Sequence, residues 1–491
     1  MYQWGCVQRL QRDVVLTGDT IAGRDEDVGA ARPRTGRAGT PSRRRTASGA
    51  LTGLAGLVAG VAASVLLRYW LEPVAVRGLV VAAAVGVAML TVDLLVYRVD
   101  RNVTRELSDT PLRPLDPRRI AIKLVSFWLT LGMIAAAYAL LPIYRDSFYA
   151  PFRQAAVLVL PALAVASPLY IAWVDRRQFE PDDAYVQLVR AVMCKPFDRG
   201  VLGVHVRGWL IKAFFIPLMF LYVCTYLDQN WSAPLLPPID FDHVFGWLLG
   251  ILYFIDVVLA LAAYSLTLRI ADSHVRSAEP TIGGFAICLA CYPPFNSVLG
   301  TYTAYDQDGL DWTGAFAHIP WLYVCWGSVI LVLVAIYAWS TAAFGLRFSN
   351  LTNRGIITSG PYRWLKHPAY VSKNVTWWMM SVPFVAGAGW QTAIQSCLML
   401  AAVNGVYFLR ARTEERHLSA DPVYRDYAAF IAEHGLVAHL RRPSSALTER
   451  LKRQLDLARK ADQVAARVAP RLVEDAQQMG AQRARTNAEL G

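Results

Sequence analysis

The segment "SNLTNRGIITSGPYRWLKHPAYVSKN", residues 349–374, is a polar interruption between two long apolar stretches of the chain. Pro361 and Pro368 each lack a backbone N–H and restrict the residue before them, so a helix cannot continue through this segment. Lys366 and His367 lie between the two prolines, and both have ionisable side chains that are uncommon in apolar packing. The pattern predicts a shaped loop that joins two apolar helices.

Apolar composition dominates the rest of the chain, which has 491 residues, 55% of them hydrophobic and only 18% charged. A hydrocarbon core of about 30 Å requires roughly 20 apolar residues per helix. We therefore expect an all-α fold, a polytopic transmembrane helix bundle with about ten spans. The expected spans cover residues 50–70, 78–97, 120–143, 154–173, 208–227, 244–268, 281–299, 319–343, 375–388 and 391–409; the last two form a tight hairpin, and prolines interrupt 281–299.

The positions of Lys and Arg predict the orientation of these spans, because short loops rich in basic residues stay in the cytoplasm. Seven basic residues occur in 98–123, six in 174–208 and five in 344–373, whereas 213–268 and 277–346 have none. This alternation predicts cytoplasmic termini and places the 349–374 segment at the cytoplasmic face. Basic loops beside an anionic inner leaflet also account for the net charge of +12, so we expect membrane lipids and no nucleic acid as partners.

Other polar residues within the apolar stretches are few. Asp93 lies within a turn or so of Arg98, where a local ion pair or snorkelling satisfies it, and the more central Asp256 must pair across the bundle or be protonated. Cys288 and Cys291 form a C-x-x-C pair without a second pair or a nearby His, so we expect packing cysteines and no metal site.

The predicted hairpin returns the chain to the face from which it started. This topology brings one polar cluster before the hairpin close to a second cluster after it. The site offers cations for a carboxylate and acids for an amine or sulfonium, without a Ser/His/Asp or Cys/His nucleophile. Group transfer between a zwitterionic soluble cofactor and a lipid-borne acceptor fits such a site. The two clusters comprise Arg363, Lys366, His367 and Tyr370, and Arg410, Arg412, Glu414 and Glu415.

These residues also carry a family resemblance. The pattern G-x-Y-x-x-x-[RK]-H-P-x-Y, a short hairpin, then E-E-x-x-L and Y-x-x-Y resembles the isoprenylcysteine carboxyl methyltransferase and phospholipid methyltransferase superfamily of integral membrane enzymes. The resemblance covers about residues 345–436. Its elements here are Gly360, Tyr362, Lys366, His367, Pro368, Tyr370, Glu414, Glu415, Leu418, Tyr424 and Tyr427.

The resemblance implies S-adenosylmethionine as cofactor and a lipophilic methyl acceptor from the bilayer, either a prenylcysteine-like carboxylate or a lipid amine. It implies an active site that faces the cytoplasm, and the Ala- and Arg-rich composition suggests a bacterial inner membrane. Catalytic roles are implied for His367, Glu415 and Arg412. Cofactor binding is implied for Tyr362, Arg363, Lys366, His367, Pro368, Tyr370, Glu414 and Glu415.

Two departures and two alternatives accompany this interpretation. The family's usual Arg before His-Pro is Lys366, which keeps the charge but loses the bidentate fork, and Ser372 stands where Gly is common. Sterol reductases of related architecture use a nicotinamide cofactor and a similar motif, but they have Asn where this chain has Ala369. A transporter or receptor-like protein without chemistry is the other alternative, with the basic and aromatic residues as interfacial anchors.

Four regions follow from these patterns. Residues 1–48 form a disordered basic arm with nine Arg, and residues 49–318 form an N-terminal transmembrane region without an assigned role. Residues 319–440 form the methyltransferase-like membrane core. Residues 441–491 form a cytoplasmic tail with an amphipathic helix.

Overall fold

The computed structural model describes residues 46–69, 73–108, 112–229, 238–305, 309–385, 387, 389–441 and 453–457. The described residues form two compact units that divide between Ala429 and Phe430. The expected basic arm lies outside the described residues except for 46–48, and so does most of the expected tail. The first unit contains the predicted site.

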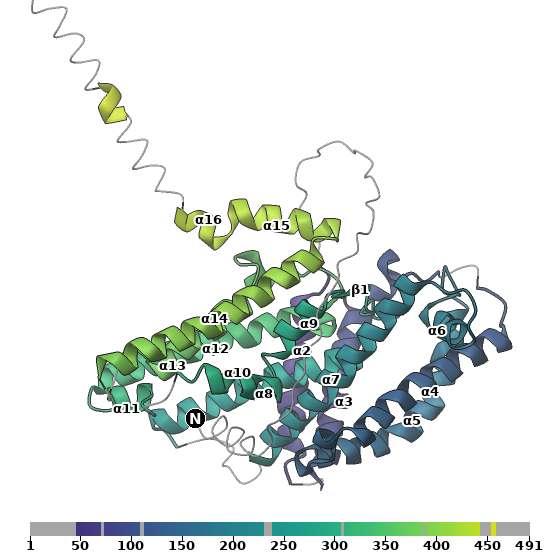
Figure 1. The fold of residues 1–491 in the computed structure, drawn as a ribbon, viewed down its shortest axis with the longest axis horizontal. Coiled ribbons are helices and arrows are strands. Elements are labelled where there is room, and N and C mark those ends of the chain that lie inside the picture. Colours follow the sequence, from purple (N-terminus) through teal and green to yellow (C-terminus); the bar gives the residue numbers. More distant parts are fainter. Residues whose placement is uncertain are drawn as a thin grey trace, which may run out of the picture. The chain divides into compact units, whose positions relative to one another are not determined.

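Helices make up most of the described chain (Figure 1), and its one sheet is a pair of two-residue antiparallel strands with Ser277 opposite Asn353. This confirms a helical fold. The α-helices are α2 (Ala50–Leu66), α3 (Val74–Leu95), α4 (Pro117–Leu140), α5 (Ala150–Asp175), α6 (Ala184–Val192), α7 (Arg199–Gln229), α8 (Phe241–Ser265), α9 (Ile282–Leu289), α10 (Phe295–Tyr302), α11 (Trp312–Phe316), α12 (Pro320–Phe344), α13 (Pro368–Ser381), α14 (Trp390–Leu418), α15 (Pro422–His434) and α16 (Leu436–Arg441). The short 3₁₀ helices are η1 (Val99–Arg101), η2 (Val103–Arg105), η3 (Pro142–Arg145), η4 (Ser147–Tyr149), η5 (Gly345–Arg347) and η6 (Gly360–Arg363), and the strands are β1 (Ser277–Ala278) and β2 (Thr352–Asn353).

Seven helices among the described residues are long and apolar enough to cross a membrane, namely α3, α4, α5, α7, α8, α12 and α14. The expected number of about ten is not confirmed. Helix α2 has 17 residues and α13 has 14, which is shorter than a full span. The expected span 281–299 is instead two eight-residue helices, α9 and α10, because Pro293 and Pro294 end the first before the second begins.

The core lies where α2, α3, α7, α8 and α12 meet. The second half of α8, from Phe254 to Tyr264, is buried on all sides, as expected of a helix that is apolar around its whole circumference. Helix α2 approaches α12 closely at Gly53, where a Cβ atom would lie 2.2 Å from the backbone oxygen of Ala342. A glycine at this position therefore lets the two helix backbones pack together.

Asp93 and Asp256, the two acids that the sequence analysis placed within apolar stretches, both have partners on other elements. Asp93 accepts a hydrogen bond from Arg347 of η5 at 3.1 Å and another from Thr52. The expected local pairing of Asp93 with Arg98 is wrong, because Asp93 faces the bundle interior whereas Arg98 lies beyond the end of α3. Asp256 accepts hydrogen bonds from Tyr337, at 2.8 Å, and Thr341 of α12.

The predicted loop between α12 and α13 is confirmed, and buried polar contacts fix its path. The Arg354 guanidinium donates to the backbone oxygens of Ser273 at 2.6 Å and Phe348 at 2.8 Å, among others. Helix α13 begins at Pro368, a position where the missing N–H has no intrahelical partner to lose. The loop is therefore held against the end of α8 before it enters α13.

Candidate functional site

The start of α13 and the end of α14 meet, as the predicted hairpin requires (Figure 1). Glu415 of α14 accepts from His367 Nε2 at 3.1 Å and lies 2.6 Å from Lys366 Nζ. Arg412, which is 67% exposed, is 3.8 Å from the second carboxylate oxygen. These four residues form what we call the rim cluster, in which three basic side chains surround one acid.

Glu414 faces a different neighbour. The Tyr370 hydroxyl donates to its Oε2 at 2.7 Å, and the Tyr370 ring stacks on His367 with centroids 5.3 Å apart. Burial raises the pKa of Tyr370 well above its ordinary value, so the hydroxyl stays protonated and keeps donating. Tyr370 thus connects the rim cluster to the next group of polar residues.

Arg410 lies one turn before Glu414 on α14 and is only 5% exposed. Its Nη2 donates to Asn350 Oδ1 at 2.7 Å and to the Tyr292 hydroxyl at 3.3 Å, and its guanidinium lies 4.9 Å from the centre of the Tyr370 ring. No carboxylate of the described residues lies within 4.0 Å of it. Hydrogen bonds and aromatic faces therefore solvate this buried cation without neutralising it.

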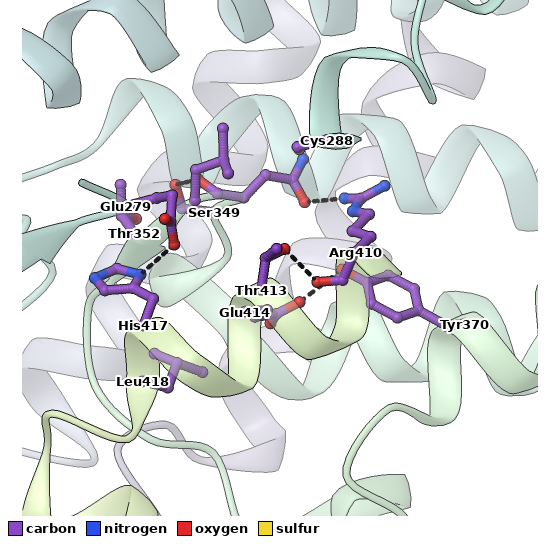
Figure 2. A pocket seen from close by; sticks show the side chains of 12 residues that line it. Glu279, Cys288, Ser349, Thr352, Tyr370, Arg410, Thr413, Glu414, His417 and Leu418 are labelled. Carbon is purple, nitrogen blue, oxygen red and sulfur yellow. Dashed lines mark hydrogen bonds and ion pairs between the residues drawn. The ribbon is translucent and has the colours of Figure 1, made fainter. Parts of the chain in front are cut away.

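Arg410 lines a small cavity, which we call the inner cavity (Figure 2). In the figure Arg410 and Tyr370 lie at one end, Glu279 and His417 at the other, and Glu414 between them. Its volume of about 20 Å³ holds roughly one water molecule, so a larger ligand requires the lining side chains to move. The lining residues are Glu279, Cys288, Ser349, Asn350, Leu351, Thr352, Tyr370, Arg410, Thr413, Glu414, His417 and Leu418.

The residues predicted to bind the cofactor occupy three different places. Tyr370 and Glu414 line the inner cavity, whereas Lys366, His367 and Glu415 belong to the rim cluster. The other three do not line the cavity: Tyr362 and Pro368 are buried in packing contacts and Arg363 is exposed.

Tyr362 is buried in packing contacts and does not line the inner cavity. Its ring lies 5.1 Å from that of Phe344, and its backbone oxygen accepts from the Tyr427 hydroxyl at 2.8 Å. Burial raises the pKa of Tyr362 well above its ordinary value. Two tyrosines of the family-like pattern thus shape the loop that carries Lys366 and His367.

Sequence reasoning missed the part of the inner cavity that comes from the N-terminal region. Glu279 follows β1, and Cys288 lies on α9, within the stretch that was expected to be a span. Pairing of β1 with β2 brings this segment to the site. The available signals were an isolated acid just before the span, Glu279, and the prolines within the span.

Comparison with known proteins supports the resemblance. The family model described as isoprenylcysteine carboxyl methyltransferase (ICMT) family matches residues 321–420, which include α12, α13, α14 and the loop between α12 and α13. Comparisons with curated proteins and with solved structures found no match. The matched region contains the whole rim cluster and one part of the inner cavity, but it does not include Glu279 or Cys288.

Proposed function

We propose that this protein is an integral membrane methyltransferase that uses S-adenosylmethionine and methylates a lipophilic acceptor drawn from the bilayer. Three observations support the proposal: the family match over residues 321–420, the apolar helices, and the charges of the inner cavity. The active site then faces the cytoplasm at the ends of α13 and α14. The acceptor is a prenylcysteine-like carboxylate or a lipid amine.

The observation that carries most weight is the buried Arg410, which has no carboxylate partner among the residues that the structure describes. Burying a charged group costs free energy unless an opposite charge or strong hydrogen bonds compensate it. The carboxylate of the cofactor's amino acid end supplies that opposite charge. Glu414 lies on the same face of α14, four residues after Arg410, where its carboxylate is available to the neighbouring ammonium group.

The chemistry places modest demands on the protein. When bound, S-adenosylmethionine would supply an activated methyl group, because the positively charged sulfur can leave with the C–S electron pair as the acceptor's nucleophile bonds to the methyl carbon. A carboxylate acceptor gives a methyl ester without releasing a proton, whereas an amine acceptor must lose one. Positioning the acceptor and excluding water are then the main catalytic contributions.

His367 is the side chain placed to accept a proton from an amine acceptor. Its Nε2 faces Glu415, and a neutral ring that donates from Nε2 keeps a lone pair on Nδ1. Glu415 then fixes the ring orientation, and Arg412 and Lys366 compensate the charge of Glu415. This division gives the rim cluster a role in orientation and proton transfer rather than in holding the cofactor's carboxylate.

Binding of the cofactor to purified, detergent-solubilised protein tests the proposal. We expect saturable binding of S-adenosylmethionine by calorimetry and none of reduced nicotinamide cofactors, which separates methyl transfer from a reductase. Lipid extracts incubated with methyl-labelled cofactor should then yield a labelled lipophilic product. A protein that binds no S-adenosylmethionine would refute the proposal.

A further inference from the structure

Most of the chain precedes the matched region, and one segment of it, β1 with α9, reaches the inner cavity. Residue 279 donates its backbone N–H to the oxygen of Leu351 at 2.8 Å, next to the β1–β2 pair. The Glu279 side chain is only 1% exposed and lines the inner cavity. A buried acid from outside the matched region therefore lies beside the residues of the proposed cofactor site.

The two oxygens of Glu279 have different surroundings. Oε1 accepts from the Thr281 backbone N–H at 3.1 Å and from the Thr281 hydroxyl. The nearest cations are more distant: Arg416 lies 3.6 Å from Oε1 and His417 Nδ1 lies 3.9 Å from Oε2. Charge-assisted hydrogen bonds are typically about 2.7–2.9 Å long. Oε2 thus has capacity to accept hydrogen bonds from a ligand in the inner cavity.

A glycine on α9 makes room for this side chain. A Cβ atom at Gly284 would lie 2.6 Å from Cδ of Glu279 and 2.7 Å from its Oε1. A contact shorter than 3.0 Å forces one partner to shift, so a Cβ atom at Gly284 displaces the carboxylate end of the flexible Glu279 side chain. The Glu279 carboxylate therefore keeps this position only with glycine at residue 284.

The part of α14 that lies beside Glu279 indicates which part of the cofactor Glu279 would contact. Its neighbour His417 lies seven residues after Arg410, which corresponds to about 10 Å along a helix. Opposite charges on one α-amino acid are too close together to span that distance. Figure 2 shows Glu414 between Arg410 and Glu279, so Glu414 is the nearer partner for the ammonium group. The ribose hydroxyls of the cofactor are further from its carboxylate than the ammonium group is.

We propose that Glu279 is a cofactor-binding residue supplied by the N-terminal region, and that its carboxylate accepts hydrogen bonds from the ribose hydroxyls of S-adenosylmethionine. This inference rests on the proposed function. Acidic side chains perform this task in dinucleotide-binding folds, because a carboxylate offers acceptors to a diol. The N-terminal spans then complete the methyltransferase site instead of forming a separate one.

Two neutral ligands test the assignment with the full-length protein in detergent. S-adenosylhomocysteine has both the ribose and the amino acid end, whereas 5′-methylthioadenosine keeps the ribose but lacks the amino acid end. By calorimetry, Glu279→Met should weaken binding of both ligands by roughly tenfold or more, since a hydrogen bond to a charged group is lost. Arg410→Met should weaken only S-adenosylhomocysteine, because its guanidinium is assigned to the amino acid end.

Three further variants and one further ligand sharpen the test. Glu279→Gln should give an intermediate loss, and Gly284→Ala should reproduce the Glu279→Met pattern through displacement of the carboxylate. Glu106→Gln is the matched control, because Glu106 pairs with Arg269 at 2.6 Å and does not line the inner cavity. The wild-type protein should bind the 2′-deoxy form of methylthioadenosine more weakly than 5′-methylthioadenosine itself. The Glu279→Met variant should bind the two ligands with the same affinity.

The outcomes separate this inference from the proposed function. If wild type binds neither S-adenosylmethionine nor S-adenosylhomocysteine, the proposed function fails before any variant is compared. If wild type binds both but Glu279→Met and Gly284→Ala bind them equally well, Glu279 has no ligand role. If Glu279→Met weakens S-adenosylhomocysteine alone, the ribose assignment is wrong. Wild-type melting temperatures for the variants exclude a general loss of folding.

Discussion

The rim cluster and the inner cavity differ in how their charges are compensated. In the rim cluster Lys366, His367 and Arg412 all face one carboxylate, and Lys366 and Arg412 are 34% and 67% exposed. In the inner cavity Arg410 is buried and has no acid partner in the described part of the chain, and the ion pairs of Glu279 are long, at 3.6 Å and 3.9 Å. A ligand that binds to an already paired, water-exposed charge gains little free energy, whereas a ligand that pairs with an uncompensated buried charge gains much more.

This difference bears on how a family-like motif is interpreted. The Lys-His-Pro segment and Glu415 stand out in the sequence because they combine charge with helix breakers. In the structure they contact mainly each other, whereas Arg410, Glu414 and Glu279 line the inner cavity. The rim-cluster residues of the motif therefore fix the loop and orient the site, while ligand affinity is expected to depend on Glu414 of the same motif and on Arg410 and Glu279 outside it.

The largest effect is expected at Arg410. Arg410→Met should lower the affinity for S-adenosylmethionine by about a hundredfold, because the loss of a buried charge-assisted contact costs on the order of 3 kcal/mol. Arg410→Lys should recover part of the affinity, since it keeps the charge but not the fork. Calorimetry on monodisperse, detergent-solubilised protein measures both affinities. Near-wild-type binding by the Met variant would contradict the view that the inner cavity contributes more to affinity than the rim cluster.

A smaller loss is expected at Tyr370, which links the two regions. Tyr370→Phe keeps the ring that stacks on His367 and lies near Arg410, but removes the hydroxyl that donates to Glu414. Glu414 should then be less well oriented, and cofactor affinity should fall by roughly tenfold. Ser381→Ala, which removes a hydroxyl of α13 that does not line the cavity, is a suitable control. Equal affinities of the two variants would show that this contact does not orient the site.

Lys366 tests the rim cluster directly. In the sequence analysis the resemblance assigned it to cofactor binding, yet its amine lies 2.6 Å from Glu415. Lys366→Met should lower cofactor affinity by no more than about threefold, because a partly exposed ion pair contributes about 0–1 kcal/mol. Lys366→Arg should bind as wild type does. A loss of more than tenfold in the Met variant would place the cofactor's carboxylate at the rim cluster after all.

The smallest effect is expected at Arg412, where exposure and a 3.8 Å separation from Glu415 leave little interaction to lose. Arg412→Ala should change cofactor affinity by less than about twofold in calorimetric titrations. Because the resemblance implied a catalytic role for Arg412, turnover with the identified acceptor should be measured as well. A large fall in turnover with unchanged cofactor affinity would assign Arg412 to the acceptor.

Much of the framework followed from local patterns. Proline positions predicted the loop between α12 and α13, hydropathy predicted the long helices, and the motif predicted the family match over residues 321–420. Hydropathy failed at residues 281–299, because two short helices separated by prolines can together be as apolar as a single span. It also could not tell that Asp93 faces Arg347, since their side chains meet only after η5 packs against α3.

Residue types and short spacings were enough to predict a helical membrane-type fold, a polar loop before a hairpin, and two acids that follow it. Contacts between distant segments were needed to find which charges compensate one another. The structure places Lys366 and His367 beside Glu415, gives Arg410 no acid partner from residues 46–441 as far as these are described, and adds Glu279 from the N-terminal region. The physical reason is that burial and charge pairing depend on distances between segments far apart in the chain, which no local pattern specifies.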